Sequence, residues 1–384
     1  MWDPEGRTVK VKSAEMSVAS ALRAEQPAAR AVLVLDDGAT FEGSSFGARR
    51  SVAGEVVFNT GMVGYPETLT DPSYSGQILV CTYPLIGNYG VTPDGAVDGI
   101  CTDFESERVQ IEGLIVGDYS SFYSHWSADR SLSQWLNDHH VPALTGIDTR
   151  ALTKHLREKG TMLGVIRFED DAIEFRDPNV ENLVAGVSVR EPRLHTPVGT
   201  PSGRVALIDC GTKHNIIRSL LSRGVEVLRL PWDHDLTGER FDGLVVSNGP
   251  GDPKMVGKTV EHVRQALDRG VPTLGICLGH QILALAIGAD TYKLKYGHRG
   301  QNQPVIDVDT NRCYITSQNH GYAVDNQTLP CGWKPWFVNL NDDTSEGLRH
   351  ADAPFRSVQF HPEAAPGPVD TAFLFDEFLA LVNR

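Results

Sequence analysis

Short apolar runs separated by polar and glycine-containing segments dominate the first part of the chain. Val32–Leu35 and Thr40–Phe41 flank Asp36-Asp37-Gly38, a pattern that predicts a β-hairpin. Helical patterns appear only later in this part. We therefore expect a β-rich domain with few helices over residues 31–190. The further predicted strands are Glu55–Phe58, Gln77–Tyr83 and Gly113–Gly117, and the predicted helices are Leu132–Asp138 and Thr149–Lys159.

Strand-like and helix-like segments alternate from residue 204 onward. Arg204–Asp209, Val225–Leu230, Gly243–Ser247 and Val271–Ile276 are short and apolar, as buried strands are. Segments with apolar residues at helical spacing lie between them. This order predicts an α/β domain with a mostly parallel sheet, in which sites form beyond the carboxyl ends of the strands. The predicted helices are Asn215–Arg223, Thr259–Arg269 and Gly279–Ile287.

Two stretches lack any such periodicity. Residues 1–30 mix acidic, basic and small residues without an apolar core, which predicts a flexible N-terminal extension and does not fit a signal or transit peptide. Residues 191–203 are polar and interrupted by prolines, which predicts a linker. The sequence thus divides into an N-terminal domain at 31–190, a linker at 191–203 and a second domain at 204–384.

Composition narrows the classes of function. The chain has 35 Lys and Arg against 49 Asp and Glu, a net charge of −14, which argues against nucleic acid or an anionic membrane as the main partner. No apolar run approaches the length of a membrane span. The 6 cysteines form no Cys-x-x-Cys pair, which favours free thiols in a reducing compartment, the cytoplasm, over a disulfide framework or a zinc site.

Cys277 lies between a predicted strand and a predicted helix. The surrounding Gly275-Ile-Cys-Leu-Gly279 has the spacing of a nucleophile elbow, a sharp turn that lifts the central side chain out of the sheet. The glycines remove Cβ atoms where the chain is crowded, and N–H groups at the helix start favour a thiolate or an oxyanion. A buried core cysteine is the other interpretation, and this motif alone leaves both open.

Two more motifs follow predicted strands of the second domain. The glycines of Asn248-Gly-Pro-Gly-Asp252 could turn backbone N–H groups toward an oxyanion, although the same pattern is common in tight turns. The strand-like segment Ser357–His361 leads into Glu363, and residues two apart in an extended chain, such as His361 and Glu363, project to the same side. By itself this pair fits an ordinary surface. Together with Cys277 it supplies the base and the orienting carboxylate that a thiol nucleophile needs.

A long polar segment, residues 59–75, separates two predicted strands of the first domain. Loops of this length are often functional. A surface loop without a role is the other interpretation, and composition alone slightly favours it.

The motifs as a set resemble the three signature blocks of class I (triad) glutamine amidotransferases. Gln318–Tyr322 and the first-domain block Gly54–Ser75 resemble, more narrowly, the small glutamine-hydrolysing component of carbamoyl-phosphate synthetase. This similarity extends from about Val32 to the end of the chain. The first domain distinguishes the family because most other class I amidotransferases lack it. The amino-acid sequences of several segments resemble those of the fused multienzymes of eukaryotic pyrimidine synthesis more than those of the bacterial small subunit.

The resemblance implies roles for individual residues. Cys277 would attack the side-chain amide of glutamine, His361 would accept its proton and later protonate ammonia, and Glu363 would orient the imidazole. A γ-glutamyl thioester would form and be hydrolysed to glutamate. Backbone N–H groups of Leu278 and of Gly249 or Gly251 would stabilise the oxyanion. Positions that hold glutamine in the family match Ser73, Gly249, Gly251, Leu278, Gln281, Asn319, Gly321 and Tyr322.

The resemblance also implies a partner. Ammonia would pass to a carbamoyl-phosphate synthetase large subunit or fused synthetase domain, for pyrimidine or arginine synthesis. That partner would use ATP, Mg²⁺ and bicarbonate, and this chain would hold no cofactor or metal. Serine in place of the nucleophile abolishes glutamine use in this family, whereas this chain has Cys277.

Two other functions fit parts of the sequence. A class I amidotransferase could supply ammonia to a different synthetase, but the block Gly54–Ser75 speaks against it. A regulatory or structural binding module could retain a degenerate glutaminase, but the intact Cys277, His361 and Glu363 speak against that.

Overall fold

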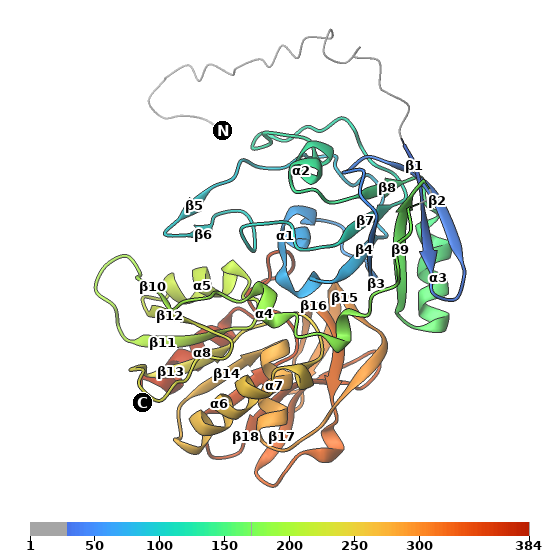
Figure 1. Cartoon of the computed structure of the whole chain (residues 1–384). Helices are drawn as coiled ribbons and strands as arrows, with labels where there is room; N and C mark the ends of the chain where they lie inside the picture. Colours follow the sequence, from blue (N-terminus) through green and yellow to red (C-terminus); the bar gives the residue numbers. More distant parts are fainter. Residues whose placement is uncertain (1–28, 170, 384) are drawn as a thin grey trace, which may run out of the picture.

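The computed structural model describes residues 29–169 and 171–383. Most of the predicted N-terminal extension, residues 1–28, therefore lies outside the described residues. The chain forms a β-barrel part, blue to green in Figure 1, which lies against a larger part built on one open sheet, yellow to red.

The barrel is closed by seven strands in the order β1-β2-β8-β7-β4-β3-β9. The predicted hairpin is confirmed: Val34 pairs with Thr40, and Gly38 has φ 88° in the turn, where a residue without Cβ is favoured. The predicted β-rich character of this part is also confirmed. Its strands are β1 (Arg30–Leu35), β2 (Thr40–Ser45), β3 (Val52–Asn59), β4 (Gln77–Cys81), β7 (Gly113–Val116), β8 (Ala143–Thr145) and β9 (Met162–Phe168), with a separate hairpin of β5 (Ala96–Val97) and β6 (Ile100–Cys101).

Both helices predicted in the first part are present with the predicted bounds. Helix α2 spans Leu132–Asp138 and buries Trp135, while α3 spans Thr149–Lys159 and packs Leu152 and Leu156 into the barrel core. The Asp148 carboxylate accepts a hydrogen bond from the Ala151 N–H at 2.8 Å, which satisfies a free donor at the start of α3.

Residues 59–75 do not form the plain loop that the sequence suggested. They contain helix α1 (Tyr65–Thr70) and a 3₁₀ turn, η1 (Pro72–Tyr74), and most of these residues are buried. Tyr65, Leu69 and Tyr74 join the apolar core beneath the barrel, which explains why the segment folds inward. The interpretation as a surface loop is wrong.

The second part is built on a ten-stranded sheet in the order β10-β12-β11-β13-β14-β19-β18-β17-β15-β16. β12, β11, β13, β14 and β19 pair in parallel, as predicted, but the remaining strands pair antiparallel. The sheet is therefore mixed, because the chain between β14 and β19 forms consecutive hairpins. The predicted linker also contributes an edge strand, β10 (Arg193–His195). The other bounds are β11 (Arg204–Asp209), β12 (Glu226–Pro231), β13 (Gly243–Val246), β14 (Thr273–Ile276), β15 (Thr291–Asp307), β16 (Cys313–Val324), β17 (Trp333–Asn339), β18 (Ser345–His350) and β19 (Phe355–Val358).

Helices cover both faces of the parallel strands (Figure 1). Along β11, Val205 and Leu207 pack with residues of α5 and α8, while Ala206 and Ile208 pack with residues of α6 and α7. Burial on both faces explains the unbroken apolar run of this strand. The helices are α4 (Val184–Val187), α5 (His214–Leu221), α6 (Gly257–Asp268), α7 (Leu278–Ala286) and α8 (Phe373–Val382), with 3₁₀ turns η2 (Pro178–Val180), η3 (Pro253–Met255) and η4 (Asn326–Thr328).

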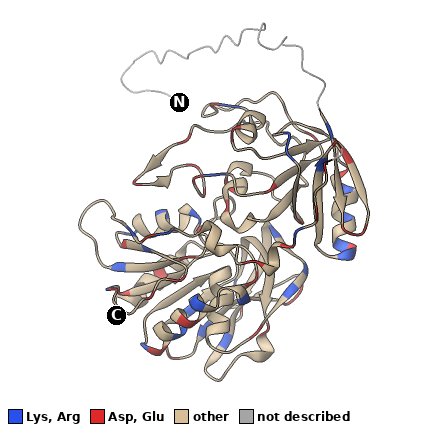
Figure 2. Ribbon diagram, in the orientation of Figure 1, with Lys and Arg blue, Asp and Glu red and all other residues tan. Residues whose placement is uncertain are grey.

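Charged residues of both signs are interspersed over the two parts (Figure 2), and α3 carries several basic residues. None of the helices within the described residues is long and apolar enough to cross a membrane. All 6 cysteines are free, as the sequence predicted.

Candidate active site

Cys277 sits at a sharp turn between β14 and α7. Its backbone has φ 53° and ψ −103°, a strained conformation for a residue with Cβ. A Cβ on Gly275 would lie 2.5 Å from the Gly279 carbonyl oxygen, and one on Gly279 would lie 2.0 Å from that of Val246. Both glycines are therefore required for the close approach of the chain, as the elbow motif predicted.

His361 and Glu363 lie in the loop after β19, which ends at Val358, three residues before the histidine. The sequence predicted a strand that extends through His361, and the predicted C-terminal end of this strand is therefore wrong. The two side chains nevertheless meet, with Nδ1 of His361 2.6 Å from Oε1 of Glu363. The Lys213 ammonium lies 3.1 Å from the same carboxylate oxygen, and all three side chains are buried.

The electrostatics of this group favour a charged histidine. Burial disfavours the imidazolium, but the charges of Glu363 and Cys277 outweigh burial and raise the pKa of His361 to about 10. Burial likewise opposes ionisation of Glu363, yet the Lys213 and His361 charges lower its pKa to about 2. The carboxylate is therefore ionised throughout the neutral range and holds the imidazole by a charge-assisted hydrogen bond.

The second ring nitrogen of His361, Nε2, is buried without a hydrogen-bond partner among the described residues. The charge of Cys277 nevertheless contributes to the raised pKa of His361, which places the two side chains near one another. The Cys277 thiol also lies 3.6 Å from the carbonyl oxygen of Asn319. The structure thus places Cys277 near the hydrogen-bonded pair of His361 and Glu363.

A pocket opens beside Cys277, between the barrel and the sheet. All eight residues that the resemblance assigned to glutamine binding line it. They are Ser73, Gly249, Gly251, Leu278, Gln281, Asn319, Gly321 and Tyr322. Of these, Ser73 comes from the barrel part and the others from the sheet part.

Ser73 is fixed in the pocket by a network that crosses between the two parts. The Asn248 side-chain amide donates a hydrogen bond to its hydroxyl at 2.9 Å, and the Asp71 carboxylate accepts one from its backbone N–H at 2.9 Å. The other oxygen of Asp71 accepts a hydrogen bond from the Asn319 amide at 3.0 Å. One carboxylate therefore positions two pocket residues from opposite sides.

The glycines and polar residues on the sheet side are equally constrained. A Cβ on Gly249 would lie 2.0 Å from the Cys210 carbonyl oxygen, and Gly251 has φ 85°. The Gln281 amide donates to the Tyr322 carbonyl at 2.9 Å and to the Gln359 side chain at 3.0 Å. The Tyr322 hydroxyl donates to the Asn179 side chain at 3.3 Å.

Several residues of this site were not predicted from the sequence. Lys213 pairs with Glu363 across 150 residues of chain, and Asp71 and Asn248 reach Ser73 only in the folded protein. Asp71 lies in the block Gly54–Ser75 and Asn248 in the segment Asn248–Asp252, but neither residue was itself predicted to belong to the site. Lys213 follows the predicted strand that ends at Asp209. Sites of α/β sheets form beyond such strand ends, so this position was the one indication in the sequence that Lys213 belongs to the site.

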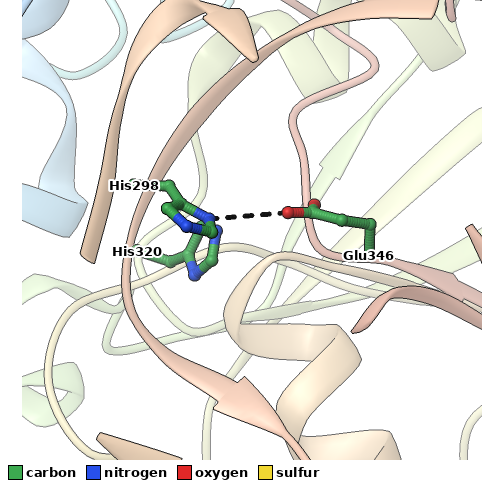
Figure 3. Close-up of side chains that lie close together, drawn as sticks. All are labelled: His298, His320 and Glu346. Carbon is green, nitrogen blue, oxygen red and sulfur yellow. Dashed lines mark ion pairs between the residues drawn. The ribbon is translucent and has the colours of Figure 1, made fainter. Parts of the chain in front are cut away.

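One group of side chains within the described residues could hold a metal ion: His298, His320 and Glu346, all buried (Figure 3). Most of their ring nitrogens already have protein partners. His298 Nε2 lies 2.8 Å from Asp342, and His320 Nδ1 lies 2.8 Å from the Tyr322 carbonyl oxygen. His298 Nδ1 faces Glu346 at 3.6 Å. Three of the four ring nitrogens of His298 and His320 are therefore engaged by hydrogen bonds to protein groups.

The elbow, the His–Glu pair and the sheet that carries them define a class I glutamine amidotransferase domain, and residues 206–381 match the family model "Glutamine amidotransferase class-I". Residues 33–166 match the model "Carbamoyl-phosphate synthase small chain, CPSase domain". The chain therefore belongs to the carbamoyl-phosphate synthase small-chain family.

Curated relatives agree with this assignment. "Multifunctional protein pyr-3" of Neurospora crassa is 50% identical over 92% of this chain and 21% of its own length. "Carbamoyl-phosphate synthase [ammonia], mitochondrial" of Homo sapiens is 50% identical over 92% of this chain and 24% of its own length. "Multifunctional protein CAD" of Squalus acanthias is 52% identical over 91% and 16%. The chain thus spans a quarter or less of the length of each of these relatives.

Proposed function

We propose that this chain hydrolyses glutamine to glutamate and ammonia and delivers the ammonia to a carbamoyl-phosphate synthetase partner. The observation that carries the proposal is the buried pair of His361 and Glu363, 2.6 Å apart, beside a cysteine on a strained elbow. The pocket next to Cys277, walled by both parts of the chain, supports glutamine as the substrate.

In the proposed reaction the proton of Cys277 resides on His361, which is held as the imidazolium, and the sulfur attacks the side-chain amide carbon of glutamine as a thiolate. The tetrahedral oxyanion receives hydrogen bonds from backbone N–H groups of Leu278 and of Gly249 or Gly251. The imidazolium then protonates the leaving nitrogen, ammonia departs and a thioester remains. Water, deprotonated by the same imidazole, hydrolyses the thioester to glutamate.

The partner in this proposal is a synthetase large subunit or fused synthetase domain, in pyrimidine or arginine synthesis. The names of the relatives support it, since they are multifunctional proteins and a carbamoyl-phosphate synthase. ATP, Mg²⁺ and bicarbonate would be used by the partner, and this chain would need no cofactor. The free cysteines support a reducing location, which we propose to be the cytoplasm.

We also propose that residues 31–190 and 204–384 are the two domains and that residues 191–203 join them. Apart from Arg30, the first residue of β1, the barrel strands lie within the first range, and the parallel strands lie within the second. The joining segment is not a free tether, because its strand β10 pairs with β12.

The experiment that tests the function measures glutamate released from glutamine by the purified chain and by Cys277→Ser, with and without a carbamoyl-phosphate synthetase large component. Activity should require Cys277 and should rise when the partner is present, because uncoupled hydrolysis would waste glutamine. Activity that survives in Cys277→Ser would refute the nucleophile. Activity that requires Cys277 but ignores the partner would refute the proposed destination of the ammonia.

A further inference from the structure

A buried cation without a counterion lines the proposed glutamine pocket. Arg299, on β15, is 5% exposed, and no carboxylate of the described residues lies within ion-pair distance of it. One terminal nitrogen, Nη1, donates to the Tyr296 carbonyl at 2.8 Å. Nε is buried without a partner, and no hydrogen bond engages Nη2 within the described residues. An uncompensated buried charge is costly, so this arrangement points to an anion that binds there.

The nearest acidic group cannot serve as that anion because its carboxylate is already occupied. Glu55 accepts hydrogen bonds from Lys293 at 2.6 Å, from Gln77 at 3.0 Å and from Thr161 at 3.1 Å. A fourth donor, Asn179, lies 3.2 Å away. The Glu55–Lys293 pair is therefore neutral as a unit and leaves the positive charge of Arg299 unbalanced.

The guanidinium of Arg299 is held beside residues of the proposed site. Arg299 pairs with Asn319 across the ladder between β15 and β16. A Cβ on Gly321 would lie 3.3 Å from Nη2, and a Cβ on Gly297 would lie 2.6 Å from Nη1. The two glycines thus make room for the planar group, and its free edge lies next to Gly321 in the pocket that Cys277 also lines.

We infer that Arg299 binds the α-carboxylate of glutamine, and this inference rests on the proposed function. Glutamine carries one anionic group, at the end opposite to the amide that Cys277 would attack. A guanidinium with a free Nε and a free Nη2 presents the two parallel donors that a carboxylate accepts. Arg299 thereby gives the pocket its preference for an amino acid over a simple amide.

The test compares two amides, glutamine and 4-aminobutanamide, which lacks the α-carboxylate. Their kcat/KM values are measured for wild type, Arg299→Gln and Arg299→Lys, with 4-aminobutanamide followed as a competitive inhibitor where its turnover is too slow. In Arg299→Gln, kcat/KM for glutamine should fall about 100-fold, mainly through KM, because a hydrogen-bonded charge pair is lost. The kcat/KM or inhibition constant of 4-aminobutanamide should change less than about 3-fold. Arg299→Lys should recover part of the lost kcat/KM for glutamine.

Arg49→Gln is the matched control, since Arg49 is an exposed arginine that pairs with Glu169 far from the pocket lining. It should behave as wild type toward both amides. If Arg299→Gln impairs turnover or binding of both amides equally, Arg299 only stabilises the strand and the inference is overturned. If wild type releases no ammonia from glutamine, the proposed function fails first, so the two failures are distinguishable.

Discussion

The substitution Glu363→Gln tests the electrostatic reasoning most directly. Raising the pKa of His361 from 6.5 to about 10 corresponds to about 5 kcal/mol of preference for the imidazolium. Glu363 is the largest favourable contributor to that preference, with the Cys277 charge second. The amide keeps the shape of the side chain but removes the charge and the acceptor pair that fix the imidazole. We expect kcat to fall by about 10³-fold to 10⁴-fold, as when a triad carboxylate becomes an amide.

The pH profile supplies the sign of the effect. A histidine whose folded pKa is raised stabilises the fold fully below its unfolded value near 6.5, and that stabilisation is lost as the pH rises through about 10. The same imidazolium protonates the leaving nitrogen in the proposed reaction. In the wild type, the alkaline limb of kcat/KM should therefore lie near pH 10, where His361 loses its proton. In Glu363→Gln it should move to lower pH, because the imidazolium loses its counterion. An alkaline limb that stays in place in the variant would refute this account.

The same substitution leaves the Lys213 ammonium buried without its carboxylate, which should cost about 3–5 kcal/mol of stability. The matched control is the double variant Lys213→Met/Glu363→Gln, which removes the stranded charge. It should regain most of the stability in urea unfolding without regaining activity. Recovery of activity in the double variant would show that the loss came from instability and not from the lost carboxylate.

Packing at the elbow, the barrel side of the pocket and the buried histidine pair can each be tested separately. Gly279→Ala should lose about 3 kcal/mol or more in urea unfolding, because its Cβ would lie 2.0 Å from a backbone oxygen that cannot move aside; wild-type stability would refute the packing argument. Ser73→Ala should raise KM for glutamine more than it lowers kcat, since Ser73 lies in the pocket and is not part of the group of thiol, imidazole and carboxylate; an unchanged KM would show that the barrel does not contribute to binding. Dialysis against EDTA should leave glutaminase activity unchanged, because hydrogen bonds account for His298 and His320; loss of activity that Zn²⁺ restores would contradict this.

The elements that could be predicted from the sequence are those determined by interactions between neighbouring residues. Helices α2 and α3 were predicted with their bounds because their caps and apolar spacing lie within the helices themselves. The elbow was predictable for the same reason, since Gly275 and Gly279 stand beside Cys277. The parallel strands followed from their uniformly apolar runs, which record burial on both faces.

The rest was determined by contacts between distant segments. The antiparallel half of the sheet was missed because β15 and β16 have polar, partly exposed residues whose pairing no local pattern records. The end of β19 was misplaced because His361 continues an apolar run but turns away to meet Glu363. The role of Arg299 could not be predicted from the sequence. A single arginine in a polar strand becomes informative only when the structure shows that it is buried and has no acidic partner within residues 29–169 and 171–383.

The carboxylate of Asp71 makes the pocket a joint property of both parts of the chain. It holds Ser73 on one side and Asn319 on the other, so that separation of barrel and sheet would dismantle the pocket wall. A ligand that fills this pocket then contributes its binding free energy to the contact between the two parts as well as to each part. In the proposed enzyme, saturation with glutamine should therefore make the two parts unfold as one cooperative unit, and an empty pocket should let them loosen separately.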